Sequence, residues 1–184
     1  LGSEDPDVAQ ELIDRMKMLL TMTADVSVSL NMTTVMENLA DTTTELLDCE
    51  RATIYIVDKL RNELRVEVAT GGCNPFSMPL NEGIAGKVAA SGVSMRIDDA
   101  YASPHFNSSV DAKMGFRTRS VMCLPVHDSE GEIVCVVQVL NKRGKRDARG
   151  ELPVFSATDE VVFGVLATQA GIVLQHAQMH DRLK

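Results

Sequence analysis

The feature that most constrains the fold of this sequence is a short apolar run in its second half, from Ile133 to Leu140. The run contains four valines and is typical of a β-strand that is buried inside a protein. The polar residues Asn141 and Lys142 follow it at once, and a long helical pattern begins at about Ser156. The sequence therefore predicts a central strand that leaves the core at Asn141 and a helix that returns to the core at Ser156.

Two carboxylates, Asp159 and Glu160, fall in the first turn of that predicted helix. The helix dipole favours negative charge there, and Ser156 or Thr158 is expected to cap the exposed amides. Lys142, at the end of the preceding strand, is placed to pair with Asp159. We predict an ion pair between these two side chains that joins the strand to the helix.

The order of these residues resembles the motif of GAF domains in cyclic nucleotide phosphodiesterases. The motif residues are Asn141, Lys142, Phe155, Asp159 and Glu160. Three further segments match the same family pattern in the same order: Asn81–Gly86, Asp98–Phe106 and Gly115–Pro125. Together they make the resemblance specific, and it covers residues 30–178 or so.

The predicted elements alternate in a way that defines a fold class. Strands are expected at Ala52–Asp58, Glu63–Thr70, Val93–Ile97, Thr118–Val126 and Glu132–Leu140, with a short helix that ends at Gly92 and an irregular linker between Gly71 and Pro79. Hairpin turns join neighbouring strands, which predicts an α+β fold with a mainly antiparallel sheet. The resemblance implies a GAF fold, with terminal helices on one sheet face and a ligand-covering lid of loop and short helices on the other.

The domain organisation follows from the same pattern. We expect a connecting helix at residues 1–30, a GAF domain at 31–178 and the start of a second connecting helix at 179–184, with residues 1–3 a cloning remnant. Both terminal helices carry apolar residues at helical spacing. We therefore predict a homodimer through the leading helix (Leu12, Met16 and Leu19) and the closing helix (Val165, Leu166, Val173 and Leu174).

Composition excludes several classes of partner. The net charge of −8 disfavours nucleic acid and anionic membranes, and no apolar run approaches the roughly 20 residues that cross a bilayer. The four cysteines (Cys49, Cys73, Cys123 and Cys135) lack metal-ligand spacing and are expected to be reduced thiols of a cytoplasmic protein. His176 and His180 have a spacing that can bind zinc, but no third ligand accompanies them. We expect no metal, no nucleic acid and no membrane insertion.

The resemblance implies a pocket for a 3′,5′-cyclic nucleotide between sheet and lid. Gly83 to Ala85 open a short helix whose free amides suit an anion, and Asn107 begins the short helix of the lid. The motif residues are expected to support the fold beside the pocket. Carried over residue by residue, the ligand-binding positions are Thr53, Ala69, Thr70, Ile84, Ala85, Asn107, Asp111, Met114, Thr118 and Gln138.

The choice of base depends on two departures from the family pattern. Members that hold guanine often carry glutamate at the position of Gln138, and an aromatic–acidic pair where this chain has Ala69 and Thr70. A carboxylate only accepts hydrogen bonds and suits guanine, whereas a glutamine amide both donates and accepts and suits adenine. The sequence therefore predicts that cAMP is preferred over cGMP.

Nothing in the sequence indicates catalysis. No nucleophile–base arrangement is visible, and the histidine–aspartate metal motifs of a phosphodiesterase catalytic domain are absent. We expect a non-catalytic domain that needs no cofactor and that, with the cyclic nucleotide as allosteric ligand, controls adjacent GAF and catalytic domains of a phosphodiesterase. The alternative is a GAF domain with a degenerate pocket that acts as a dimerisation or interaction module.

Overall fold

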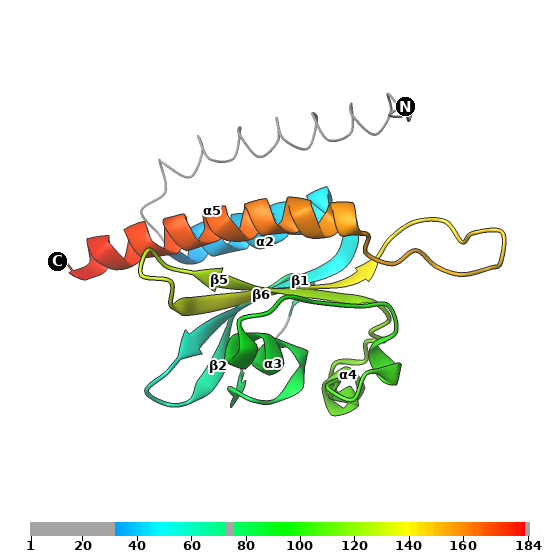
Figure 1. Ribbon diagram of the computed structural model, residues 1–184, viewed down its shortest axis with the longest axis horizontal. Helices are drawn as coiled ribbons and strands as arrows, with labels where there is room; N and C mark the ends of the chain where they lie inside the picture. Colours follow the sequence, from blue (N-terminus) through cyan, green and yellow to red (C-terminus); the bar gives the residue numbers. More distant parts are fainter. Residues whose placement is uncertain (1–31, 73–75, 183–184) are drawn as a thin grey trace, which may run out of the picture.

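The computed structural model describes residues 32–72 and 76–182. One antiparallel sheet forms the centre of this structure. Its six strands lie in the order β3-β2-β1-β6-β5-β4 (Figure 1). The strands are β1 Cys49–Asp58, β2 Glu63–Ala69, β3 Ser77–Pro79, β4 Met95–Ile97, β5 Val121–His127 and β6 Ile133–Lys142. The helices are α2 Met32–Leu46, α3 Gly83–Ser91, η1 Ala100–Ala102, α4 Ser108–Met114 and α5 Ala157–Arg182.

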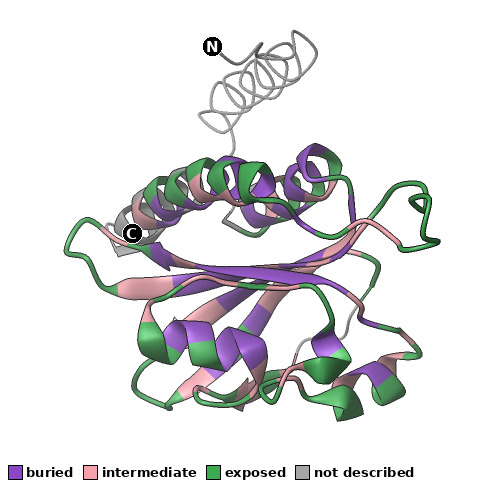
Figure 2. Ribbon diagram, turned by 45° about the vertical axis from the view of Figure 1, so that its right-hand side comes forward, coloured by how far each residue is buried: buried purple, intermediate pink, exposed green. Residues whose placement is uncertain are grey.

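Helices cover both faces of this sheet. In Figure 1, α5 and α2 lie side by side on one face, while α3 and α4 lie on the other. Figure 2 shows buried residues concentrated in the sheet and on the helix surfaces that face it. The predicted α+β class, with terminal helices on one face and short helices on the other, is confirmed.

The apolar run that begins β6 is explained by these two covered faces. Cys135, Val137 and Val139 belong to the core beneath α2 and α5, whereas Val136 belongs to the core beneath α3. A strand that is buried on both faces has a nearly continuous run of apolar residues in its sequence. Gln138 interrupts the run on the α3 side and pairs across the ladder with Thr53 of β1.

Several predicted boundaries need correction. β1 begins three residues earlier than expected, because Cys49 pairs with Lys142, and β4 begins at Met95 rather than Val93. The supposed linker before α3 contains β3, which pairs with β2 at the edge of the sheet. Pro79 is tolerated there because an edge strand needs no second ladder partner.

The prediction for the closing helix was wrong at two residues. Leu166 and Leu174 were assigned to a dimer interface, but both are 2% exposed and belong to the core between α5 and the sheet. Val165 is 46% exposed and remains available at the surface. The predicted leading helix lies outside the described residues, as do Cys73 and the side chain of Val173. Among the described helices, none is long and apolar enough to cross a membrane.

Candidate functional site

The predicted ion pair lies where three elements meet. Lys142 Nζ is 3.0 Å from Asp159 Oδ1 and also donates a hydrogen bond of 2.7 Å to the carbonyl of Leu47, just after α2 ends. The two charged side chains are 14% and 4% exposed. This pair therefore connects the end of β6, the end of α2 and the start of α5.

Asp159 also caps its own helix. Its Oδ2 accepts a hydrogen bond of 2.8 Å from the Ser156 amide, and the Ser156 hydroxyl accepts one of 3.1 Å from the Asp159 amide. This reciprocal pair is a capping box with aspartate in place of glutamate. Burial by itself raises the pKa of Asp159, but the Ser156 hydrogen bonds and the Lys142 ammonium outweigh it and hold the pKa below its usual value.

The lowered pKa of Asp159 predicts a pH dependence of stability. A carboxyl whose pKa is lower in the folded state contributes stability above its unfolded pKa, here near 3.8, and loses it as the pH falls through the folded value. We expect the free energy of unfolding to fall more steeply below pH 4 in the wild type than in Asp159→Asn. Urea unfolding between pH 5 and pH 2.5 measures both slopes. If the free energy of unfolding falls equally steeply with pH in both proteins, the pKa of Asp159 is not lowered by folding.

Asn141 holds the segment that enters β5. Its φ of 60° lies in the left-handed region, which asparagine tolerates. Its Oδ1 accepts a hydrogen bond from the Arg119 amide at 2.6 Å, and its Nδ2 donates to the Arg117 carbonyl and to Glu50 Oε2, each at 2.9 Å. This buried amide therefore has partners on both sides and fixes the chain just ahead of β5.

The other two motif residues, Phe155 and Glu160, contact different parts of the structure. Phe155 is 2% exposed in the core beneath α2 and α5. Glu160 Oε1 accepts a hydrogen bond of 2.9 Å from the Ser94 hydroxyl, ahead of the edge strand β4. None of the five motif residues lines the cavity described next.

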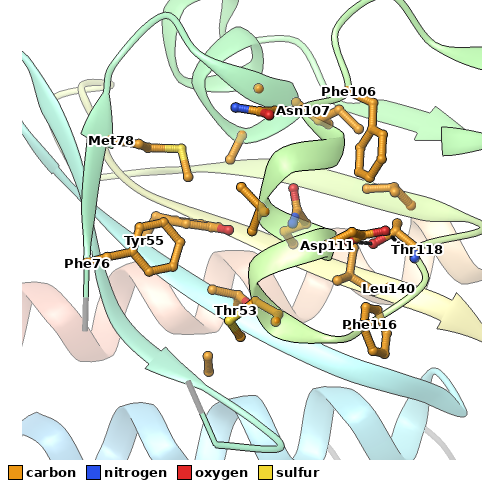
Figure 3. A pocket seen from close by; sticks show the side chains of 18 of the residues that line it. Thr53, Tyr55, Phe76, Met78, Phe106, Asn107, Asp111, Phe116, Thr118 and Leu140 are labelled. Atoms are coloured by element: carbon orange, nitrogen blue, oxygen red, sulfur yellow. Dashed lines mark hydrogen bonds between the residues drawn. The ribbon is translucent and has the colours of Figure 1, made fainter. Parts of the chain in front are cut away.

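A cavity of about 270 Å³ lies on the α3 and α4 side of the sheet. Its floor is formed by β1 and β6, and its walls by β3, α3 and α4. Figure 3 shows Thr53 and Tyr55 of the sheet on one side of this space, and Phe106 and Asp111 on the other. All ten positions predicted for ligand binding line it: Thr53, Ala69, Thr70, Ile84, Ala85, Asn107, Asp111, Met114, Thr118 and Gln138.

The start of α3 lies at one end of this cavity. Gly83 has a φ of 68°, and no side chain caps the helix at Glu82. The first amides of a helix have no intrahelical partner, and Gly83, Ile84 and Ala85 all line the cavity. This end of the cavity therefore suits a negatively charged group.

Several of the ten positions use their polar atoms within the protein. The Thr118 amide and hydroxyl each donate a hydrogen bond of 2.7 Å to Asp111. The Thr70 hydroxyl accepts from the Ala52 amide at 2.9 Å, and Asn107 Oδ1 caps α4 by accepting from the Ser109 amide at 3.1 Å. By contrast, no hydrogen bond of the Gln138 side-chain amide is found among the described residues, and this side chain lines the cavity.

The cavity also contains residues that the sequence analysis missed. Arg51 and Tyr55 lie on the same face of β1 as Thr53, and the two-residue period of a strand could have identified them. The Arg51 guanidinium lies 4.1 Å from the centre of the Phe116 ring. The missed lining residues include Arg51, Tyr55, Phe76, Met78, Phe106 and Phe116. These aromatic rings offer stacking surfaces that Ala69 lacks.

The described cysteines are not placed for chemistry. Cys49, Cys123 and Cys135 are buried free thiols. Burial raises the pKa of Cys49 to about 12, and it also raises the pKa values of Cys123 and Cys135. Among the side chains that the structure describes, no group of three or more metal-binding residues is close enough to hold an ion. The side chains of His176 and His180 lie outside the described part of the chain.

Comparison with known proteins identifies the family. The sequence model of the GAF domain matches residues 31–174. A probable 3′,5′-cyclic phosphodiesterase pde-5 of Caenorhabditis elegans is 28% identical over an alignment of 201 positions that covers all of this chain. The dual 3′,5′-cyclic-AMP and -GMP phosphodiesterase 11 of Drosophila melanogaster is 36% identical over 134 residues, or 73% of this chain. The chain spans only 26% and 8% of the lengths of these two relatives.

Solved structures have the same fold at low sequence identity. The GAF domain of a phosphoenolpyruvate-protein phosphotransferase from Coxiella burnetii has a TM-score of 0.79 and 17% identity, over 92% of this chain and 98% of that one. The free methionine-R-sulfoxide reductase from Neisseria meningitidis has a TM-score of 0.75 and 18% identity, over 98% and 96% of the two chains. At these identities, the similarity establishes the fold alone.

Proposed function

The chain belongs to the GAF domain family, and we propose that it is a non-catalytic regulatory domain that binds a 3′,5′-cyclic nucleotide. One observation carries this proposal: ten positions assigned from the family pattern all line one cavity between the sheet and α4. The relatives' names describe cyclic nucleotide phosphodiesterases. The parent protein is then a phosphodiesterase whose catalytic domain lies outside this chain.

The chemistry of the cavity matches the parts of such a ligand. The uncapped start of α3 offers amides to a single phosphate. Thr53 and Gln138, which are neighbours across the β1–β6 ladder, offer a hydroxyl and an amide to a base edge. The volume of about 270 Å³ lies just below the usual range of about 300–1,000 Å³ for small-molecule sites, so the cavity suits a compact ligand.

The ligand would regulate the parent through its helices. α3 contacts the cavity with its first turn, and the segment after it hydrogen-bonds to α5 through Ser94 and Glu160. α5 runs from Ala157 to Arg182, near the end of the chain. A ligand that favours one position of α3 therefore has a physical connection to the helix that leads toward the next domain.

Selectivity between the two cyclic nucleotides is expected to depend on Gln138. An amide donates to adenine N1 or N7 and accepts from N6, whereas a glutamate at this position would accept from the N1 and N2 donors of guanine. We expect wild type to prefer cAMP. Gln138→Glu should move the affinity ratio toward cGMP by about 1–3 kcal/mol, measured by competition titration with both nucleotides.

A matched control separates base recognition from a general charge effect. Gln175→Glu makes the same chemical change on α5, where the side chain contacts Ser129 rather than the cavity, and should leave the ratio unchanged. If wild type favours cGMP, or if Gln138→Glu leaves the ratio where it was, Gln138 does not read the base.

We also propose that the domain is a homodimer through its terminal helices. Val161, Val165 and Ile172 are 66%, 46% and 45% exposed, and their spacing of four and seven residues places them on one face of α5. Sedimentation should show a dimer that Val165→Glu weakens. Leu60→Glu, at a fully exposed leucine in the β1–β2 turn, is the control and should not alter the dimer. A wild-type monomer at high micromolar concentration would contradict the proposal.

The competing function is that of an interaction module with a degenerate pocket. It is favoured by Ala69 and Thr70, since alanine offers no ring for stacking and the Thr70 hydroxyl is engaged by Ala52. The two functions differ in one result. A module that only dimerises binds neither nucleotide and keeps its dimer when nucleotide is added.

A further inference from the structure

A segment of the chain folds over the cavity between β4 and β5. We call residues 98–117 the lid; it contains η1 and α4. Phe106, Val110 and Met114 of the lid line the cavity from the side opposite the sheet. The lid therefore bounds the space that a ligand would occupy, and the contacts that fasten the lid determine how far this space can open.

One buried carboxylate gathers three of these contacts. Asp111 of α4 is 6% exposed. Its Oδ2 accepts hydrogen bonds from the Tyr101 hydroxyl at 3.0 Å and from the Thr118 amide at 2.7 Å, and its Oδ1 accepts from the Thr118 hydroxyl at 2.7 Å. Asp111 therefore joins η1, α4 and the segment that enters β5. Figure 3 shows Asp111 directed toward Thr118.

Tyr101 is itself held by neighbouring side chains. The Arg117 guanidinium lies 3.7 Å from the centre of the Tyr101 ring, and the Phe106 ring lies 5.0 Å from it in a tilted arrangement. Partial burial and then the hydrogen bond to Asp111 raise the pKa of the Tyr101 phenol. The hydroxyl therefore remains protonated at neutral pH and donates to the carboxylate.

The far end of this network is anchored to the sheet. Thr118 is followed by Arg119, whose amide donates to Asn141 Oδ1 at 2.6 Å and whose carbonyl accepts from the Ala100 amide at 2.7 Å. Both ends of the lid therefore meet at the start of β5. The hydrogen bonds between Asp111 and Thr118 therefore hold α4 against the segment that enters β5.

We propose that Asp111, Tyr101 and Thr118 form a lid network that holds the lid closed and sets the rates at which ligand enters and leaves. Asp111 and Thr118 line the cavity, but in this structure the polar atoms of all three side chains bond to one another, so we assign them a positioning role in the lid. This inference rests on the proposed function for the identity of the ligand. The stability of the closed lid, however, is a property of the chain alone and can be measured without ligand.

Three substitutions test the network at different points. Tyr101→Phe removes one hydroxyl at a 41% exposed site and keeps the ring against Arg117 and Phe106. Thr118→Val removes the hydroxyl donor, and Asp111→Asn removes the charge. Thr44→Val is the control, because it makes the same chemical change as Thr118→Val at a hydroxyl that donates to the Ala40 carbonyl within α2, far from the lid (Figure 1).

Amide hydrogen exchange without ligand measures the network directly. In Tyr101→Phe we expect exchange across residues 98–117 to rise about tenfold, as for the loss of one hydrogen bond to a charged group. Exchange in β5 and β6 should remain as in wild type, and Thr44→Val should match wild type throughout the lid. Unchanged exchange in the lid of both Tyr101→Phe and Thr118→Val would overturn the proposal.

Binding kinetics then separate positioning from ligand contact. With cAMP carrying a fluorophore on its ribose 2′-oxygen, stopped flow should show association and dissociation both about tenfold faster in Tyr101→Phe, with less change in Kd. A faster dissociation alone would mean that the network contacts ligand, and would overturn the proposal. If wild type binds no cyclic nucleotide, the proposed function fails, and hydrogen exchange still decides whether the network closes the lid.

Discussion

Replacing Lys142 with alanine is expected to lower the free energy of unfolding by about 3–5 kcal/mol, the usual cost of leaving one charge of a buried pair without its partner. Asp159 is 4% exposed and would lose its cation, and the Leu47 carbonyl would lose its donor. Asp159→Ala should cost a similar amount and also removes the cap of α5. Urea unfolding monitored by circular dichroism measures each change.

The double variant shows whether the two side chains act as a pair. Lys142→Ala with Asp159→Ala should cost less than the sum of the single variants, because neither charge is left buried alone. Lys59→Ala is the control: it breaks the exposed Lys59–Glu132 pair and should cost less than about 1 kcal/mol. Strictly additive effects at Lys142 and Asp159 would refute the pairing.

The same variants should weaken ligand binding only indirectly. Neither Lys142 nor Asp159 lines the cavity. Both residues hold the end of β6, where Asn141 fixes the entry to β5 beside the lid. We therefore expect loss of affinity to follow loss of stability across these variants.

Gly86→Ala is expected to cost about 1–3 kcal/mol of stability, because it overpacks a tight turn. A Cβ at this position would lie 2.8 Å from the Leu80 carbonyl oxygen and 3.0 Å from the carbonyl carbon of Asn81. The turn before α3 must then move, and the amides of Gly83 to Ala85 move with it. We expect cyclic nucleotide affinity to fall as well.

Gly164→Ala is the matched control for this substitution. A Cβ at Gly164, in α5, meets nothing within 4 Å. Because alanine is the better helix former, the change should raise stability by about 0.5–1 kcal/mol. Unfolding curves and nucleotide titrations of both variants test the pair. If Gly86→Ala is as stable as wild type and binds nucleotide equally well, the turn does not position α3.

The motif and the fold class were predictable because their signals are local. The apolar run of β6, the polar pair after it and the carboxylates at the start of α5 follow one another in the chain, so the Lys142–Asp159 contact could be expected. β3 was missed because its three residues include Pro79 and are too few to show an alternating pattern. Leu166 and Leu174 were misplaced because helical spacing reveals an apolar face without saying what covers it.

The residues that line the cavity were largely predictable from the family pattern, but the hydrogen bonds among their side chains were not. The pattern placed Asp111 and Thr118 at the site, yet it gave no sign that they hydrogen-bond to each other and to Tyr101. These hydrogen bonds depend on how α4 packs against the segment that enters β5. The spacing of apolar residues in the sequence does not reveal that packing. Phe76 was missed for a different reason, since it lies just before β3 in a segment that was read as an irregular linker.

The central claim is that this cavity binds a 3′,5′-cyclic nucleotide, and isothermal titration calorimetry of the chain tests it most directly. Separate titrations with cAMP and cGMP, with 5′-AMP as the control that lacks the cyclic phosphate, compare the three ligands under one set of conditions. We predict one saturable site per chain, with cAMP bound more tightly than cGMP and 5′-AMP bound least. The absence of saturable binding by both cyclic nucleotides would contradict the claim.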